Sequence, residues 1–251
     1  RRQLSGQATY LAFVDFRKAF DLVPHGALLA KLRAIGVRGA TFKFIAGLYK
    51  TSSVAVTLAC GTGQPVPCQR GVRQGCPLSP ILLDVFINDI LVEARPHAAH
   101  VPQLGTRLPG LGFADDLVLV AASLAKLKAL VGSVEGWAIR WEMEFGVTKC
   151  GLMGIGHHQD DLRNLSPAIS IAGEPVPIVD DYMYLGIKFH HSLDVSHMIE
   201  DRVSKAWRAF HVMHPLLTAK SVPVAVRRAL YTGGLLPVIL YGAELTGMSS
   251  Q

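Results

Sequence analysis

The sequence predicts an α+β domain followed by a helical C-terminal segment. Over residues 1–193, short apolar runs typical of strands alternate with segments of helical spacing. From residue 195 onward the spacing is helical throughout. A length of 251 residues, with 50% hydrophobic side chains, is ample for a packed core. We therefore expect a boundary near Leu193, with a mixed domain over 1–193 and a helical region over 194–251.

The first elements follow from periodicity and from their stop signals. Residues 9–16 form a short apolar run, which predicts a buried strand that ends at Asp15. Residues 26–36 carry leucines and an isoleucine at helical spacing and then a glycine, so we expect a helix there and a second one over 39–50. Residues 53–60 alternate like a strand.

The middle of the chain contains the clearest turn signals. Residues 61–75 carry four glycines and two prolines, and we expect the next helix to start at Ser79 and Pro80, with Ser79 as its N-cap, and to reach Ile90. The later predicted elements are a strand over 118–121, a helix over 124–144, strands over 168–173 and 182–189, and helices from 195 onward. In those C-terminal helices, a stripe of apolar residues predicts core packing: Val203, Ala206, Trp207 and Phe210.

Composition bounds the functional classes. The chain has 25 Lys and Arg against 19 Asp and Glu, a net charge of +6, and a pI of about 9.3. This modest surplus suits a polyanionic partner. From Val195 to the end there are six basic and three acidic residues, so this segment is a candidate for phosphate contact. Four cysteines without a CxxC pair favour neither a zinc site nor a disulfide framework, and fit a reducing compartment.

No apolar stretch approaches the roughly 20 residues that a membrane-spanning helix needs, and the N-terminal residues lack the pattern of a signal peptide. We therefore expect no membrane association. The chain opens on Arg1-Arg2 without an initiator methionine, from which we expect an excised domain or a piece of a longer protein.

Two adjacent carboxylates stand inside an apolar run, in the segment GFADDLVLV over 112–120. The flanking residues predict two strands joined by a tight turn, with Asp115 and Asp116 at its tip. At an effective dielectric of about 20, two charges roughly 5 Å apart repel by about 3 kcal/mol, so the pair needs cations or water. A solvated turn is one interpretation. The other is that neighbouring strands bring Asp15 to the same sheet edge, where three carboxylates suit two Mg²⁺ ions in phosphoryl transfer.

Three long blocks resemble the central palm blocks of reverse transcriptases, especially those of non-LTR (LINE-like) retrotransposons. The blocks are FVDFRKAFDLVPHGALLAKLRAIGV over 13–37, GVRQGCPLSPILLDVFINDI over 71–90 and GFADDLVLVAAS over 112–123. VTKCGLM over 147–153, YMYLGI over 182–187 and LLPVILYGAEL over 235–245 are similar to the later palm, primer-grip and thumb segments. The resemblance covers roughly residues 11–245, and it implies a polymerase palm, an antiparallel sheet backed by helices, followed by a helical thumb.

The resemblance also implies roles for the acidic residues. Asp15 and Asp115 match the principal metal ligands, Phe16 adds its backbone carbonyl, and Asp116 supports the same site. The implied cofactors are two Mg²⁺ ions, with Mn²⁺ as a substitute, and the implied reaction is attack of a primer 3′ hydroxyl on the α-phosphate of a deoxynucleotide.

Further positions match nucleotide-binding and primer-grip residues of the family. Phe20 looks like the steric gate that excludes a 2′ hydroxyl, although a core role is the alternative. The implied nucleotide-binding residues are Phe20, Arg73, Gln74, Gly75 and Lys149, and the implied primer grip is Tyr184, Leu185 and Gly186. For Arg73 and Lys149 a solvated side chain is equally compatible with the pattern, and Tyr184 is equally compatible with a core position.

The sequence departs from the family before its first block, since only 14 residues precede Asp15. We expect the fingers to be largely missing. The leading hypothesis is an RNA-directed DNA polymerase domain that binds an RNA template, a DNA primer and dNTP; the sequence does not indicate an obligate protein partner. An inactive palm–thumb remnant that only binds nucleic acid is the alternative, and a group II intron maturase-like polymerase fits the blocks less well. The implied location is intracellular, and nuclear for a eukaryotic retroelement.

Overall fold

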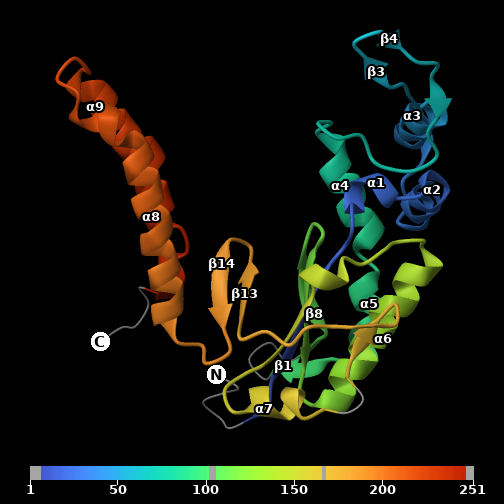
Figure 1. Cartoon of the computed structure of the whole chain (residues 1–251). Helices are drawn as coiled ribbons and strands as arrows, with labels where there is room; N and C mark the ends of the chain where they lie inside the picture. The colour runs from blue at the N-terminus through green and yellow to red at the C-terminus, as the bar shows by residue number, and fades with distance from the viewer. Residues whose placement is uncertain (1–6, 102–105, 166–167, 247–251) are drawn as a thin grey trace. The chain divides into compact units, whose positions relative to one another are not determined.

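The structure is a computed structural model that describes residues 7–101, 106–165 and 168–246 (Figure 1). The chain divides into two compact units, Arg1–Val179 and Asp180–Gln251, and each is described by itself. The division falls earlier than the expected boundary at residues 193 and 194, because a hairpin over 181–190 packs against the first C-terminal helix.

A four-stranded antiparallel sheet forms the centre of the first unit. Its strand order is β10 (Gly151–Gly154), β1 (Tyr10–Asp15), β9 (Asp116–Ala121) and β8 (Gly110–Phe113). The two middle strands are the most apolar and are largely buried, as expected for strands covered on both faces. The mixed helix and strand class predicted from the sequence is confirmed.

Helices cover this sheet and fill the core. The long helix α6 (Leu124–Arg140) packs against β9 and β1, and the Ser123 side chain caps it by accepting from Lys126 N. The short helix α7 (His158–Arg163) lies so close to β10 that a Cβ on Gly154 would stand 2.2 Å from the His158 carbonyl oxygen. A glycine is therefore required at that crossing.

Two helices expected as longer segments end early. The helix expected from Ser79 to Ile90 is broken into α4 (Leu78–Ile87) and α5 (Ile90–Ala94), and the helix expected over 124–144 ends at Arg140. Ser79 is not the N-cap, since it lies inside α4 and donates its hydroxyl to the Arg73 carbonyl.

The segment between β1 and α4 is mostly helical. It contains α1 (Ala19–Leu22), α2 (His25–Ala34) and α3 (Gly39–Lys50), in agreement with the helices expected at 26–36 and 39–50. The single strand expected over 53–60 is instead split between two small antiparallel pairs, β2 (Ser53–Val54) with β5 (Val66–Pro67) and β3 (Thr57–Leu58) with β4 (Gly61–Thr62). The remaining elements of the first unit are the 3₁₀ helices η2 (Arg95–His97) and η4 (Val147–Lys149), and the strands β6 (Ala99–Val101), β7 (Thr106–Leu108), β11 (Ser170–Ile171) and β12 (Glu174–Pro175).

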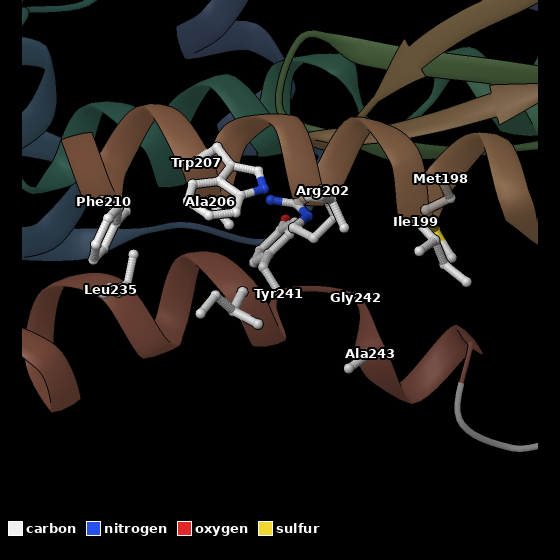
Figure 2. Close-up of a pocket in the computed structure, with 12 residues that line it drawn as sticks. Met198, Ile199, Arg202, Ala206, Trp207, Phe210, Leu235, Tyr241, Gly242 and Ala243 are labelled. Atoms are coloured by element: carbon white, nitrogen blue, oxygen red, sulfur yellow. The ribbon is translucent and has the colours of Figure 1, made fainter. Parts of the chain in front are cut away.

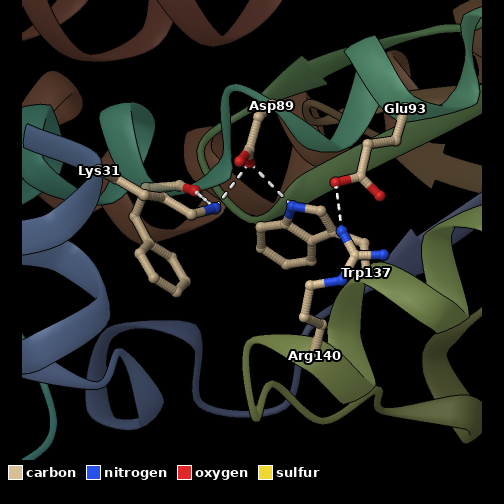
Figure 3. Close-up of polar contacts among 6 residues, drawn as sticks. Lys31, Asp89, Glu93, Trp137 and Arg140 are labelled. Carbon is tan, nitrogen blue, oxygen red and sulfur yellow. Dashed lines mark hydrogen bonds and ion pairs between the residues drawn. The ribbon is translucent and has the colours of Figure 1, made fainter. Parts of the chain in front are cut away.

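A buried lysine joins three helices (Figure 3). Lys31 Nζ on α2 donates to Asp89 Oδ1 and to the Phe86 carbonyl, both at 2.7 Å. Trp137 on α6 donates its indole N–H to the same Asp89 oxygen at 2.8 Å. The ammonium also lies 4.0 Å from the ring centroid of Trp141. Burial lowers the pKa of Lys31, and the hydrogen bond to Asp89 opposes that shift.

The second unit contains a hairpin and the C-terminal helices. The hairpin pairs β13 (Asp181–Tyr184) with β14 (Ile187–His190), and the helices are α8 (Val195–Thr218), α9 (Val224–Leu230), the π-helical turn η5 (Tyr231–Leu235), α10 (Leu236–Leu240) and α11 (Ala243–Thr246). The strand expected over 182–189 is thus a hairpin, because Leu185 and Gly186 both have positive φ and make a tight turn. No helix in the described ranges is both long and apolar enough to cross a membrane.

The apolar stripe of α8 does not form a closed core. Trp207 is 57% exposed and Val203 is 49% exposed. Both line a groove of about 460 Å³ between α8 and the segment that includes Leu235 and Tyr241 (Figure 2). The expectation of core packing for this stripe is therefore wrong: the second unit has too few layers to cover that side of α8.

Candidate active site

Three aspartates lie where the two middle strands of the sheet end. Ala114, with φ 51°, and Asp115 make the two-residue turn between β8 and β9, as the apolar runs on either side predict. Asp116 is the first residue of β9, and it pairs directly with Asp15, the last residue of β1. All three aspartates are partly buried.

The electrostatics of this strand end reflect the crowding of like charges. Partial burial is the largest cause that raises the pKa of Asp116, followed by the carboxylates of Asp115 and Asp15. Lys149 opposes the shift, and its Nζ lies 3.5 Å from Asp15 Oδ2. That lysine is 73% exposed, so its ion pair is screened by solvent and offsets the repulsion only in part.

The donor set suits a hard divalent cation. Asp15 Oδ2 is buried and has no hydrogen-bond partner, and two further carboxylates neighbour it. Phe16 continues β1 as an isolated bridge to Phe145, and its ring stacks on Phe145 with centroids 5.0 Å apart. In this bridge Arg17 N donates to the Glu144 carbonyl, and Gly146 N donates to the Asp15 carbonyl. The bridge therefore does not use the Phe16 carbonyl. Across the described ranges, no group of three or more His, Cys, Asp or Glu has the geometry of a ready-made metal centre.

The second cluster joins α1 to the glycine-rich turn before α4. Phe20 is half-buried against the core, and its carbonyl accepts from Val72 N at 2.7 Å. Gln74 donates its side-chain amide to Asp21 Oδ1 at 2.8 Å. The first and second sequence blocks are thus bound to each other through backbone and side chain.

Gly71 makes this junction possible. Its φ is +89°, and a Cβ there would lie 3.1 Å from the Asp21 carbonyl oxygen, so a side chain would be both strained and crowded. Gly71 N donates to the Val23 carbonyl, and its own carbonyl lies 2.8 Å from His25 Nε2.

The remaining predicted nucleotide-binding residues differ in their surroundings. Arg73 is exposed and donates to the Leu48 carbonyl of α3 at 3.3 Å. Gly75 has φ +79° and open space where a Cβ would be, so the backbone can be approached closely there. Lys149 lies beside Asp15 rather than near Gln74 or Arg73 in the contacts of the described chain.

Asp21 and His25 were not among the residues that the motifs singled out. The signal for Asp21 was present, since it is the second aspartate of the DFRKAFD block. Nothing in its local pattern indicated a partner 53 positions away, which only the folded chain reveals.

The predicted primer grip is the tip of the hairpin in the second unit. The Leu185 carbonyl accepts from the Tyr241 hydroxyl at 2.7 Å, and the Gly186 carbonyl accepts from Arg202 at 2.8 Å. Tyr184 lies at the end of β13 and is half-buried, with its ring centroid 6.4 Å from that of Phe189. The turn is therefore fixed to α8 and to the C-terminal segment.

Comparison with known proteins gives a consistent result. The family model for reverse transcriptase (RNA-dependent DNA polymerase) matches residues 2–189. The chain is 23% identical over 258 residues to a Pol polyprotein of the type-1 retrotransposable element R2 from Popillia japonica, covering 99% of this chain and 41% of that protein. It is 23% identical over 248 residues to the RNA-directed DNA polymerase from mobile element jockey of Drosophila melanogaster, covering 96% of this chain and 26% of that protein. The chain thus spans less than half the length of these relatives.

A solved structure of telomerase from Candida tropicalis, in complex with a fragment of telomeric RNA, shares the fold with a TM-score of 0.52 and 12% identity. The matched region covers 96% of this chain and 39% of the telomerase chain. The palm–thumb polymerase fold expected from the three blocks is thereby confirmed. The relatives that this chain matches include polymerases of the retrotransposable elements R2 and jockey. Since the family model matches well over half of its residues, this chain belongs to the reverse transcriptase family.

Proposed function

We propose that this chain is the RNA-directed DNA polymerase domain of a retroelement, which joins deoxynucleotides to a primer 3′ hydroxyl on an RNA template. The observation that carries the proposal is the direct pairing of Asp15 with Asp116 beside Asp115, at the partly buried end of β1 and β9. Three carboxylates are held together there despite their repulsion, and such an arrangement is costly unless it serves a cation.

Asp15, Asp115 and Asp116, with the Phe16 carbonyl, would hold two Mg²⁺ ions, or Mn²⁺ in their place. Bound there, such ions supply charge neutralisation at the attacking and leaving oxygens of a phosphoryl transfer. The chain itself supplies the strand ends that fix the carboxylates. These ends belong to β1 and β9, whose other residues are largely buried. Lys149, 3.5 Å from Asp15 Oδ2, would donate to the departing pyrophosphate.

The junction of α1 with the turn before α4 would bind the incoming nucleotide. Phe20 would exclude a 2′ hydroxyl, and Gln74 and Gly75 would contact the nucleotide and template. Arg73 would meet a phosphate. The backbone bond between Phe20 and Val72 supports this assignment, because it keeps the two blocks at a fixed separation.

Residues 1–193 would act as the palm and residues 194–251 as a thumb-like region. The hairpin tip at Tyr184, Leu185 and Gly186 would place the primer end. Its support is the pair of hydrogen bonds that anchor the Leu185 and Gly186 carbonyls.

Primer extension on an RNA template, with deoxynucleotides and Mg²⁺, tests the function. A metal site contributes several kcal/mol to such a transfer, so Asp115→Asn is expected to lower the rate more than about 100-fold. Asp160→Asn is the matched control, since Asp160 is an exposed aspartate on α7. Equal extension by wild type and Asp115→Asn would refute the assigned site. Absence of extension by the wild type would instead favour a remnant that only binds nucleic acid.

A further inference from the structure

The positive charge of this chain is concentrated in one segment. Residues 22–83 contain seven Lys and Arg and no Asp or Glu, whereas the rest of the chain carries 18 basic and 19 acidic residues. The whole net charge of +6 therefore comes from this segment rather than from the C-terminal helices. In the first unit this segment forms α2, α3 and the small hairpins β2–β5.

Not all seven charges are available to a partner. Lys31 is buried and paired with Asp89, and Arg70 forms an ion pair with Glu142. The other five are exposed: Arg33, Arg38, Lys43, Lys50 and Arg73. Within the described ranges, none of these five forms an ion pair with a carboxylate, so their charge is uncompensated.

Four of these five cations converge on one groove. A groove of about 570 Å³ between the end of α2 and the length of α3 is lined by Arg33, Arg38, Lys43 and Lys50. The Arg33 guanidinium stacks on the Phe42 ring, with its carbon 4.4 Å from the ring centroid, and Arg38 donates to the carbonyls of Arg33 and Val37. These contacts hold both guanidinium groups in place beside the groove.

Small residues of α3 also line the groove. Gly39, Ala46 and Gly47 line it together with the two lysines, and a Cβ at either glycine would meet nothing within 4 Å. Lys43 and Lys50 lie seven residues apart, about 10.5 Å along the helix and on nearly the same face. The remaining lining residues, Val37 and Phe42, are apolar, so a strand lying along α3 would meet both cations and apolar side chains.

The helix that lines the groove also contacts the proposed nucleotide-binding cluster. Arg73 Nη2 donates to the Leu48 carbonyl, two residues before Lys50 on the same helix. The fifth exposed cation, Arg73, is thus attached to the same helix, α3, as Lys43 and Lys50.

We propose that this groove binds the sugar–phosphate backbone of a nucleic-acid strand outside the aspartate site. Uncompensated cations in a groove whose lining contains no acidic residue are the electrostatic signature of phosphate contact. The choice of a nucleic acid over another polyanion rests on the proposed function. The presence of the positively charged groove does not depend on that function.

Binding is measured by fluorescence anisotropy with labelled single-stranded RNA and DNA of one sequence, without nucleotides, across a salt series. Lys43→Gln with Lys50→Gln removes two groove charges, and Lys126→Gln with Lys128→Gln removes two exposed charges from α6 as the matched control. Each phosphate contact contributes about 0.7 to the salt slope for a single strand, so the groove variant should be shallower by about 1.4, with the control unchanged. The RNA and DNA arms identify which strand the groove prefers.

A second measurement uses the unmodified protein. Acetylation of lysines, followed by mass spectrometry, should show Lys43 and Lys50 protected by the oligonucleotide while Lys126 and Lys128 stay reactive. An equal effect in groove and control variants, equal protection of all four lysines, or no binding by the wild type would overturn the proposal. Neither binding measurement needs polymerisation. A failure of primer extension therefore does not contradict the groove proposal, and a failure of groove binding does not contradict the aspartate site.

Discussion

At the scale of single residues, the chemistry depends on which side chains the fold forces together. Asp15 and Asp116 are 101 positions apart in the chain and directly opposite in the sheet. The sequence predicts both strand ends, because each aspartate closes or opens an apolar run. It does not predict their pairing, which depends on the order of the strands. Asp21 with Gln74 is the same case, since neither residue's local pattern names its partner.

The raised pKa of Asp116 has a consequence for stability. Burial and two like charges raise this pKa in the folded chain, so the folded state holds its proton at a pH where the unfolded state has lost it. Stability therefore falls as the pH rises above the ordinary value of 3.8 and through the raised pKa. Asp116→Asn removes the charge and should stabilise the metal-free fold at pH 7 by up to about 1 kcal/mol.

Urea unfolding with a chelator present, at pH 7 and at pH 3, measures this effect. The gain should be absent at pH 3, where the carboxyl is protonated in both states. Asp160→Asn should show neither the gain nor its pH dependence. A loss of stability in Asp116→Asn at pH 7 would mean that this carboxylate is structural.

Asp21 should act as a positioning residue for Gln74. Asp21→Ala removes the acceptor of one side-chain hydrogen bond, which is worth about 0.5–1.5 kcal/mol, so the KM for dNTP should rise by about 2- to 10-fold with a smaller change in kcat. Steady-state primer extension measures both constants. The double variant Asp21→Ala with Gln74→Ala should be no worse than Gln74→Ala alone. Additive losses would mean that the two residues act separately.

At the scale of elements, the periodicity of the sequence predicted where most helices lie. It did not predict where several elements end or how deeply their apolar residues are buried. The helix over 39–50 and the tight turn at Asp115 agree with prediction, because each has strong local signals. The strand expected over 182–189 is a hairpin, since its two turn residues carry little turn signal beyond one glycine. The stripe on α8 looked like core, yet Trp207 is 57% exposed, because burial is decided by neighbours that spacing does not reveal.

The link between α2, α4 and α6 should depend on Lys31. Lys31→Met leaves the partly exposed Asp89 carboxylate with only the Trp137 N–H, and breaking a buried pair in this way costs about 3–5 kcal/mol at most. The free energy of unfolding in urea measures the cost. Lys43→Met, at an exposed position of α3, should stay within about 0.5 kcal/mol of the wild type. A loss below 1 kcal/mol for Lys31→Met would show that the aromatic rings alone hold the three helices.

At the scale of the whole molecule, the sequence blocks predicted the palm–thumb fold and the family, and both are confirmed. The division into units and the location of the charge required more than motifs. A hairpin that looked like part of the sheet domain belongs to the C-terminal unit, because its tip is anchored by Tyr241 and Arg202. The charge of residues 22–83 is visible in the sequence, yet its gathering in a groove depends on the contact between α2 and α3.

The central claim is that Asp15, Asp115 and Asp116 form a divalent metal site. Electron paramagnetic resonance of free Mn²⁺, titrated with the protein, measures binding without substrates. The wild type should bind Mn²⁺, and Asp15→Asn or Asp116→Asn should weaken binding at least about tenfold, with Asp160→Asn unchanged. Equal Mn²⁺ binding by the wild type and both site variants would contradict the assignment of these aspartates as metal ligands.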